Sequence, residues 1–186
     1  MVENMEKSFD DGLDDKITCK TPTITINGHL QDVIKDGSSE KEIDQGNNQI
    51  CIGCHELICE LISGLEEKEK DQLYFAVGSS DEKATSNDSG LVKLLFKHKI
   101  FEKTADGKEG IKINGNVLTL TAYFYGEPDP NLDVDDDGNP VSSENYNTEW
   151  RECAIYKGDT MLNRKIHDPI VKNSSIEAMR TFKFTF

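Results

Sequence analysis

The chain has 186 residues, enough for one domain with an extension, and 35% of them are hydrophobic. It carries 35 Asp and Glu residues against 21 Lys and Arg residues, which gives a net charge of −14. This charge disfavours binding to nucleic acids or to an anionic membrane surface, because both need clustered basic side chains. No apolar run approaches the roughly 20 residues of a membrane-spanning helix, so we expect no membrane insertion.

The N-terminal segment is acidic where a secretion signal would be basic and then apolar. We therefore expect synthesis in a cytosol, and we expect residues 1–16 to form an arm that a partner orders. Residues 17–28 predict a first strand or an extended arm, and residues 34–48 predict a polar loop. The sequence thus divides into an acidic arm and loop at 1–48 and a single β-rich domain with one helix at 49–186.

Between residues 52 and 65 the apolar residues recur at the spacing of an α-helix. The apolar residues that fall on one helical stripe are Cys54, Leu57, Ile58, Leu61, Ile62 and Leu65. The charged run at 66–71 follows, which predicts that the helix ends near Gly64. This is the one amphipathic helix that we expect.

Most of the remaining chain has the pattern of short strands separated by turns. The expected strands are 73–77, 92–101, 111–114, 117–125, 150–156, 161–166 and 175–186. Asn114-Gly115 is typical of a tight hairpin turn. In the last strand Phe182, Phe184 and Phe186 alternate with polar residues, so one face is buried and the other exposed. The pattern predicts a mainly β fold, a β-sandwich of short antiparallel strands.

The strand expected at 150–156 alternates between two faces. One face carries Trp150, Ala154 and Tyr156, and the other carries Arg151, Cys153 and Ile155. The next strand follows a two-residue turn, and its Arg164 is placed to form an ion pair with an acid of the preceding strand. A partly buried pair of this kind fixes strand register more than it adds stability.

Residues 133–144 match the calcium-loop pattern D-x-D-x-D-G-x5-E throughout. The candidate calcium ligands are Asp133, Asp135, Asp137, Asn139 and Glu144. Ca²⁺ takes about six to eight oxygen ligands, and Gly138 allows the sharp bend that such a loop needs. Neither flank has a helical pattern and Pro140 replaces an apolar residue, so we expect an isolated site rather than a paired EF-hand. The alternative is a solvated acidic loop rich in turn formers.

Cys51-Ile52-Gly53-Cys54-His55 has the C-x-x-C-H form of c-type haem attachment. With Cys59 the same segment offers four zinc ligands, although structural zinc sites normally join two separated pairs. We favour buried core thiols over both, because Cys54 lies on the apolar stripe of the expected helix and a small thiol packs well there.

The Ser and Cys residues stand in no recognisable catalytic signature, and the four histidines are scattered along the sequence. The fingerprints of phosphate and dinucleotide binding are also absent from the sequence. We therefore expect a non-enzymatic protein.

Four segments of the chain together resemble a known family. They lie at 76–78, 91–100, 149–156 and 161–165. In this order, over residues 73–186, the chain resembles a diffuse family of tailed-phage tail, fibre, collar and baseplate proteins. It departs from the family pattern at Lys93, where an acid is usual, and in the length of its acidic insert.

The resemblance implies a virion structural protein, assembled in the host cytoplasm with other tail proteins and with copies of itself. The rival interpretation is a calcium-dependent β-sandwich binding module, such as part of a lectin or adhesin. In that case Tyr123, Tyr125 and Tyr146 are the aromatic residues that would contact a glycan. A haem or zinc protein is the second rival.

Overall fold

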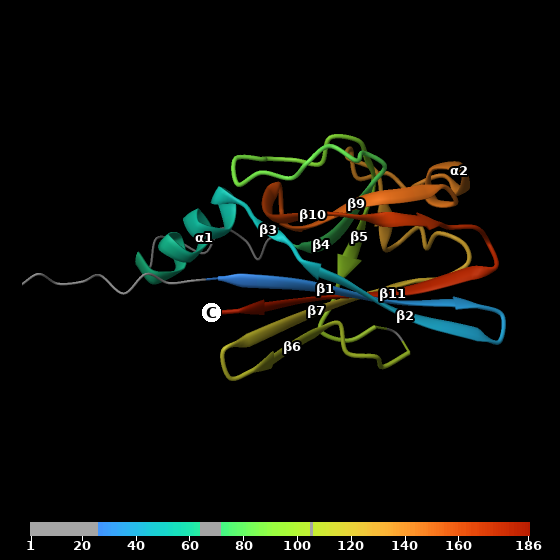
Figure 1. Cartoon of the computed structure of the whole chain (residues 1–186), viewed down its shortest axis with the longest axis horizontal. Helices are drawn as coiled ribbons and strands as arrows, with labels where there is room; N and C mark the ends of the chain where they lie inside the picture. Colours follow the sequence, from blue (N-terminus) through green and yellow to red (C-terminus); the bar gives the residue numbers. More distant parts are fainter. Residues whose placement is uncertain (1–25, 64–71, 105) are drawn as a thin grey trace, which may run out of the picture.

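The computed structural model describes residues 26–63, 72–104 and 106–186. In these residues two antiparallel sheets lie face to face, which confirms the predicted mainly β sandwich (Figure 1). The arm expected at 1–16 and most of the segment 17–28 lie outside the described residues, so those expectations stay predictions.

The first sheet has five strands in the order β2-β1-β11-β7-β6. Their bounds are β1 Asn27–Asp36, β2 Ser39–Asn47, β6 Ile111–Asn114, β7 Val117–Phe124 and β11 Ile176–Thr185. β1 and β11 pair along their whole length, from Asn27 opposite Thr185 to Asp36 opposite Ile176. Strands from the two ends of the described chain are thus neighbours in one sheet.

The second sheet has six strands in the order β3-β10-β9-β4-β5-β8. Their bounds are β3 Gln49–Ile50, β4 Leu73–Gly78, β5 Leu94–Ile100, β8 Asp133–Val134, β9 Glu149–Lys157 and β10 Thr160–Val171. β9 and β10 form a hairpin whose turn contains Gly158 at a φ of 56°, a conformation that favours glycine. β9 lies between β10 and β4, so its residues have sheet neighbours on both sides.

Within the described residues, two helices accompany the sheets. α1 spans Ile52–Ser63, which matches the predicted helix up to the point where the description ends. α2 is a single turn at Ser143–Tyr146 inside the segment that we expected to be a loop. The hydroxyl of Ser142 accepts a hydrogen bond from the backbone N–H of Asn145, which caps this turn. No helix in the described parts of the chain is long and apolar enough to cross a membrane.

The prediction of a loop at 34–48 is wrong for most of its length. β2 occupies Ser39–Asn47 and pairs with β1 from Asp36 opposite Ser39 to His29 opposite Asn47. It is an edge strand with mostly exposed side chains, so it lacks the buried face that makes strands visible in a sequence. β1 and β2 belong to the same sheet as β11, β7 and β6. Within the described residues, the predicted boundary between 1–48 and 49–186 therefore does not separate two independent units.

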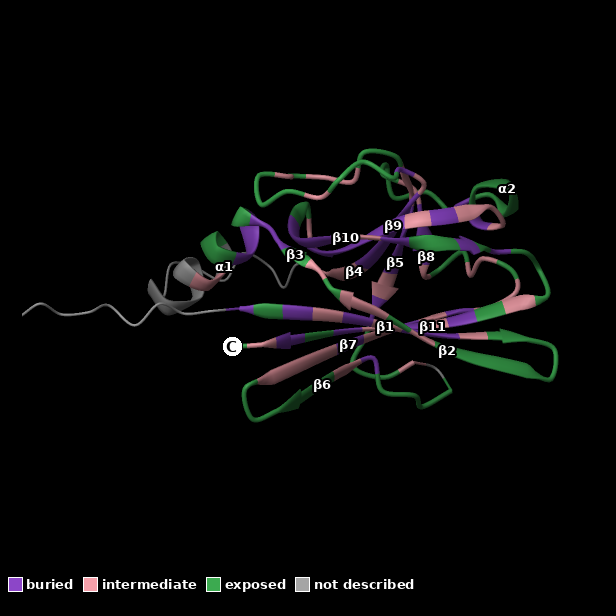
Figure 2. Ribbon diagram, viewed as in Figure 1, coloured by how far each residue is buried: buried purple, intermediate pink, exposed green. Residues whose placement is uncertain are grey.

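Buried residues lie on the strands of both sheets (Figure 2), and aromatic side chains fill much of the core between them. Phe75 of β4 stacks on Phe182 of β11 with ring centroids 5.2 Å apart, and Phe124 of β7 meets Trp150 of β9 edge to face at 5.1 Å. Phe182 and Phe184 are also buried, as the alternation in the last strand predicts, but the prediction is wrong for Phe186, which is 45% exposed. Such contacts add to the free energy gained by removing large apolar surfaces from water.

Trp150 lies on the face opposite to the one we expected. It packs in the core with Cys153 and Ile155, whereas Ala154 and Tyr156 point to the outer side of the second sheet. The alternation of β9 breaks between Glu152 and Trp150, at the place where the β9–β10 pairing is irregular: Glu152 is opposite Ile166, but Trp150 is opposite Ile170. An irregular pairing of this kind interrupts regular strand geometry.

Candidate functional site

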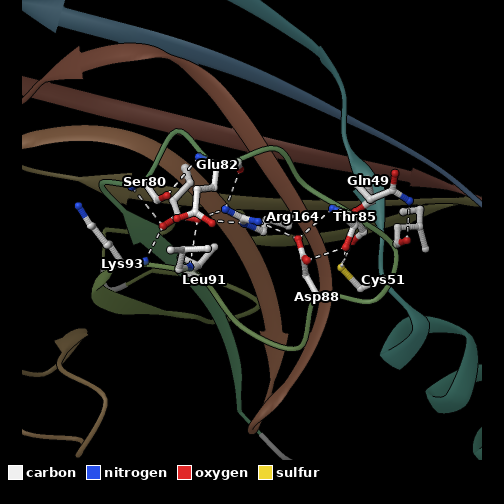
Figure 3. A network of polar contacts seen from close by, with 12 residues as sticks. Gln49, Cys51, Ser80, Glu82, Thr85, Asp88, Leu91, Lys93 and Arg164 are labelled. Carbon is white, nitrogen blue, oxygen red and sulfur yellow. Dashed lines mark hydrogen bonds and ion pairs between the residues drawn. The ribbon is translucent and has the colours of Figure 1, made fainter.

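The most elaborate polar network of the described chain lies on the outer face of the second sheet (Figure 3). A long connection, residues 79–93 between β4 and β5, crosses this face, and we call it the strap. Beneath it lies a small cluster of buried residues: Cys51, Ala76, Ala154, Tyr156 and Met161. The strap therefore closes the outer side of the second sheet.

Glu152 of β9 holds both ends of the strap. Its carboxylate accepts hydrogen bonds from the backbone N–H of Ser80 at 3.3 Å, of Lys93 at 2.9 Å and of Val92 at 3.4 Å. The side chain is 0% exposed. A buried carboxylate is stable only when its oxygens are fully paired, and the ends of the strap supply these donors.

Gly78 ends β4 immediately before the strap. A Cβ atom there would lie 2.6 Å from Glu152 Oε1 and 2.6 Å from the carbonyl oxygen of Lys93. Only glycine allows the backbone to approach both groups so closely. The glycine and the glutamate of the family-like segments are thus parts of one arrangement.

Arg164 of β10 connects Glu152 to the middle of the strap. Its Nε donates to Glu152 at 2.9 Å, its Nη1 to Asp88 at 2.7 Å, and its Nη2 to the carbonyl oxygen of Glu82 at 3.0 Å. Burial opposes the charge of Arg164, but the contacts with Asp88 and Glu152 outweigh it and raise its pKa. The predicted pairing of Arg164 with an acid of the preceding strand is therefore confirmed.

The Cys51 thiol also lies under the strap, 4.0 Å from the carbonyl oxygen of Thr85. Burial raises the pKa of Cys51 and of Cys54 to about 11, so both are neutral thiols at physiological pH. Both are buried and free of disulfide bonds, whereas His55 is exposed. The side chain of Cys59, a candidate ligand in the zinc hypothesis, lies outside the described residues. The haem and zinc hypotheses therefore stay predictions.

The acidic loop carries the five candidate calcium ligands, and the structure gives three of them, Asp133, Asp135 and Asn139, protein partners. Asp133 is buried, with Oδ1 2.8 Å from His98 Nδ1 and Oδ2 accepting the backbone N–H of Asp129 at 2.8 Å. Asp135 accepts the backbone N–H of Asn139 at 2.8 Å. These contacts are those of a folded acidic turn.

The other candidates, Asp137 and Glu144, are exposed, and Glu144 lies in the turn of α2. The neighbouring Asp136 forms an ion pair with Lys97 at 2.8 Å. Among the residues that the structure describes, no group of three or more His, Cys, Asp or Glu side chains could hold a metal ion. The calcium site stays a prediction that a titration can test.

A groove of about 290 Å³ lies on the outer face of the first sheet. Tyr123 and Tyr125 line it together with Val33, Lys35 and Met179. Lys108 places its ammonium group 4.8 Å from the Tyr123 ring and 5.2 Å from the Tyr125 ring, and it is paired with Asp106 at 2.8 Å.

Tyr146, the third tyrosine proposed for glycan contact, is fully buried in the core beside Phe96 and Trp150. Its hydroxyl donates to the carbonyl oxygen of Tyr125 at 3.1 Å. The prediction that Tyr146 could contact a glycan is therefore wrong.

The sandwich core contains a buried polar region, and sequence reasoning missed it. Arg180 of β11 donates from Nε to Asp32 of β1 at 2.7 Å and from Nη2 at 3.0 Å, and both residues are 0% exposed. They are direct partners in the β1–β11 register but lie far apart in sequence. The only sequence signal was that each of the two residues, Asp32 and Arg180, is a charged residue at a core-facing position of a strand with alternating faces.

His167 of β10 lies in the same polar region. Its Nδ1 donates to the carbonyl oxygen of Asp168 at 2.7 Å, so the neutral tautomer leaves Nε2 as an acceptor. His167 Nε2 and Arg180 Nη1 are both buried without a partner among the described residues. Burial and the positive charges of Arg180 and Lys165 lower the pKa of His167 to about 2.

Comparisons with protein-family models, with curated proteins and with solved structures found no match for this chain. The contacts of the strap, the groove and the core are therefore the observations from which a function is inferred.

Proposed function

We propose that this protein is a non-enzymatic structural subunit of a phage-like tail, fibre-attachment, collar or baseplate assembly. Its partners are other virion proteins and copies of itself. The proposal rests on the sequence resemblance and on one structural relationship that gives the resemblance a physical basis.

That relationship is the convergence of the four family-like segments. They are distant in sequence, yet they form the adjacent strands β10, β9, β4 and β5 together with the end of the strap. Gly78, Glu152 and Arg164, one from each of three segments, are the residues that fix the strap to the sheet. A shared pattern of this kind is expected if these residues define a common fold unit.

An assembly subunit also needs surfaces for neighbours. Ile113 of β6 is 75% exposed and Phe186 at the C-terminal end is 45% exposed. Phe186 is tied to the β6–β7 turn, because its backbone N–H donates to the carbonyl oxygen of Asn116 at 3.1 Å. Exposed apolar side chains gathered at one end of a domain are typical of contact surfaces between proteins.

Sedimentation velocity and negative-stain electron microscopy test the proposal. We expect rings, stacks or other discrete oligomers that grow with concentration, and we expect Ile113→Lys to shift them towards the monomer. Val171→Lys is the matched control, because Val171 is 61% exposed on the other sheet. A chain that stays monomeric at high concentration and is encoded away from other tail genes would contradict the proposal.

A glycan-binding module is the second candidate, and the groove beside Tyr123 and Tyr125 favours it. Aromatic side chains with polar tips suit ligands that are apolar on one side and hydroxylated on the other. A glycan array followed by titration calorimetry tests it, with Tyr125→Ala as the variant. Binding by the wild type that this variant loses, in a protein that remains monomeric, would favour the glycan function over the structural one.

A further inference from the structure

Lys172 is a buried lysine at the end of β10 that the proposed function does not use. It is 1% exposed, although it carries a charge and lies beside a connection. Its backbone N–H donates to the carbonyl oxygen of Thr148 at 2.9 Å. This bond fixes Lys172 beside Asn147, the residue that ends helix α2.

The side chain of Lys172 turns towards Asn147. Its Nζ lies 3.4 Å from Asn147 Oδ1, 3.0 Å from the carbonyl oxygen of Gly126 and 2.8 Å from that of Asn173. The Tyr146 ring lies 4.8 Å from the same nitrogen. The amine of the buried Lys172 is therefore held against the half-buried side-chain amide of Asn147.

Glu127 lies on the other side of the same amide. Its Oε2 accepts from Asn147 Nδ2 at 3.5 Å and from the Ser143 hydroxyl at 3.0 Å. An amine, an amide and a carboxylate are thus arranged in sequence, with the amide in the middle. The carboxylate contacts the nitrogen that would leave if the amine attacked the amide carbon.

The electrostatics of the site favour a reactive amine. Burial lowers the pKa of Lys172 to about 8, against the opposing influence of Glu127, Asp133 and Glu177. An amine with such a pKa is partly uncharged near neutral pH, and only the uncharged form is a nucleophile. Proximity then replaces a bimolecular encounter by an intramolecular one, which is a large kinetic advantage.

We propose that Lys172 and Asn147 form an intramolecular isopeptide bond. The neutral Nζ adds to Asn147 Cγ, a new Cγ–Nζ bond forms, and the Cγ–Nδ2 bond breaks. One proton passes from Nζ to Nδ2, with Glu127 as the carrier, so that the leaving group departs as ammonia. The reaction needs no oxidant, cofactor or energy source, and its atoms and charges balance.

The bond joins the end of α2 to the end of β10 and so encloses the β9–β10 hairpin. The closed loop contains Glu152 and Arg164, the two residues that hold the strap. A covalent closure restricts the unfolded chain and keeps the hairpin from separating. This property goes beyond the proposed structural role and does not depend on it.

Intact-mass spectrometry of the purified chain, incubated at pH 8, is the direct test. The expected mass is that of the sequence minus one ammonia, and the linked fraction should form faster as pH rises through about 8. Asn-Gly ring closure at Asn114-Gly115 causes the same loss, so a tryptic map must accompany the measurement. The map should contain one branched species that joins the peptides 113–151 and 166–180, because modified Lys172 resists trypsin.

Variants assign the roles of the three groups. Lys172→Arg keeps the positive charge but should abolish the branched peptide, and Asn147→Ala should do the same. Glu127→Gln should leave the site folded and slow the linkage by about 100-fold, the usual effect of losing a general acid–base group. Asn147→Asp should lose water in place of ammonia.

If Lys172 serves only as a buried cation that anchors the loop, mass spectrometry and the tryptic map should give the opposite results. If the wild-type chain keeps its full sequence mass after prolonged incubation at pH 8, and trypsin cleaves at Lys172 to give 166–172 and 173–180, the proposal is overturned. Lys172 would then be a buried cation that binds three oxygen atoms. If the branched peptide forms in Glu127→Gln at the wild-type rate, Glu127 takes no part in the mechanism, but the proposed isopeptide bond itself stands.

Discussion

Arg164 and Glu152 form a buried ion pair across the β9–β10 hairpin, with Nη2 and Oε2 2.8 Å apart, and the pair fixes the strap to the second sheet. Both side chains are almost completely inaccessible to solvent. Each charge is tolerated because the other, together with the strap backbone, satisfies its hydrogen bonds.

Replacing Arg164 with Met should lower the free energy of unfolding by about 3–5 kcal/mol, because it leaves a buried carboxylate without its cation. The strap should loosen before the rest of the fold. Urea unfolding gives the free energy, and hydrogen exchange at residues 79–93 reports the strap.

Arg151→Met is the matched control for this change. Arg151 is on the same hairpin and pairs with Glu149, but both side chains are partly exposed. Its loss should cost less than about 1 kcal/mol. Equal effects of the two substitutions would show that burial of the Arg164 pair contributes nothing.

His167 should make the protein sensitive to mild acid. Its folded-state pKa is lowered from 6.5 to about 2. Above pH 6.5 neither state binds the proton, whereas below it only the unfolded state does. The free energy of unfolding should therefore fall by about 1.4 kcal/mol per pH unit as pH drops below 6.5.

The variant His167→Asn tests this, because its amide can still donate to the Asp168 carbonyl but does not titrate. We expect a lower stability at pH 8, from lost packing, and a shallower fall between pH 6.5 and 5. An unaltered slope in His167→Asn would mean that this histidine is protonated in the folded state.

The sequence was informative where burial imposes a period. The alternation of Phe182 and Phe184 predicted β11, and the helical stripe predicted α1. The tight turn after Asn114 also formed as predicted, with Gly115 at a φ of 60°. Local patterns of this kind depend only on which side of an element faces the core.

Features that depend on distant residues escaped prediction. β2 lies at an exposed edge and therefore has no buried period. The Asp32–Arg180 pair joins the first and the last strand of the described chain, and one sequence does not tell which strands will be neighbours. The predicted face of Trp150 was wrong because the alternation of β9 breaks beside it, where the β9–β10 pairing is irregular, and no residue of β9 signals that break.

The aromatic core should depend strongly on Phe184. Changing it to Ala should lower the free energy of unfolding by about 3–5 kcal/mol, from lost burial and from the cavity that remains. Phe186→Ala is the matched control two residues later, and since Phe186 is 45% exposed its loss should cost less than about 1 kcal/mol. Chemical denaturation of both variants decides whether the inner face of β11 is as buried as the structure has it.

The acidic loop at 133–144 tests the calcium hypothesis. Asp133 and Asp136 already have basic partners in His98 and Lys97. The hypothesis expects the melting temperature to rise in millimolar Ca²⁺, because a ligand that binds only the folded state stabilises it by mass action. The double variant Asp135→Asn with Glu144→Gln should lose that rise and remain folded without calcium.

Asp133→Asn separates the two roles of the loop. Asp133 is buried against His98 and the Asp129 backbone, so this change should lower the melting temperature even without calcium. Mg²⁺ should stabilise the wild type less than Ca²⁺, because it prefers a tighter octahedral shell and gives up water reluctantly. A wild-type melting temperature that is the same with and without millimolar Ca²⁺ would show a solvated acidic turn, held by its histidine and lysine partners alone.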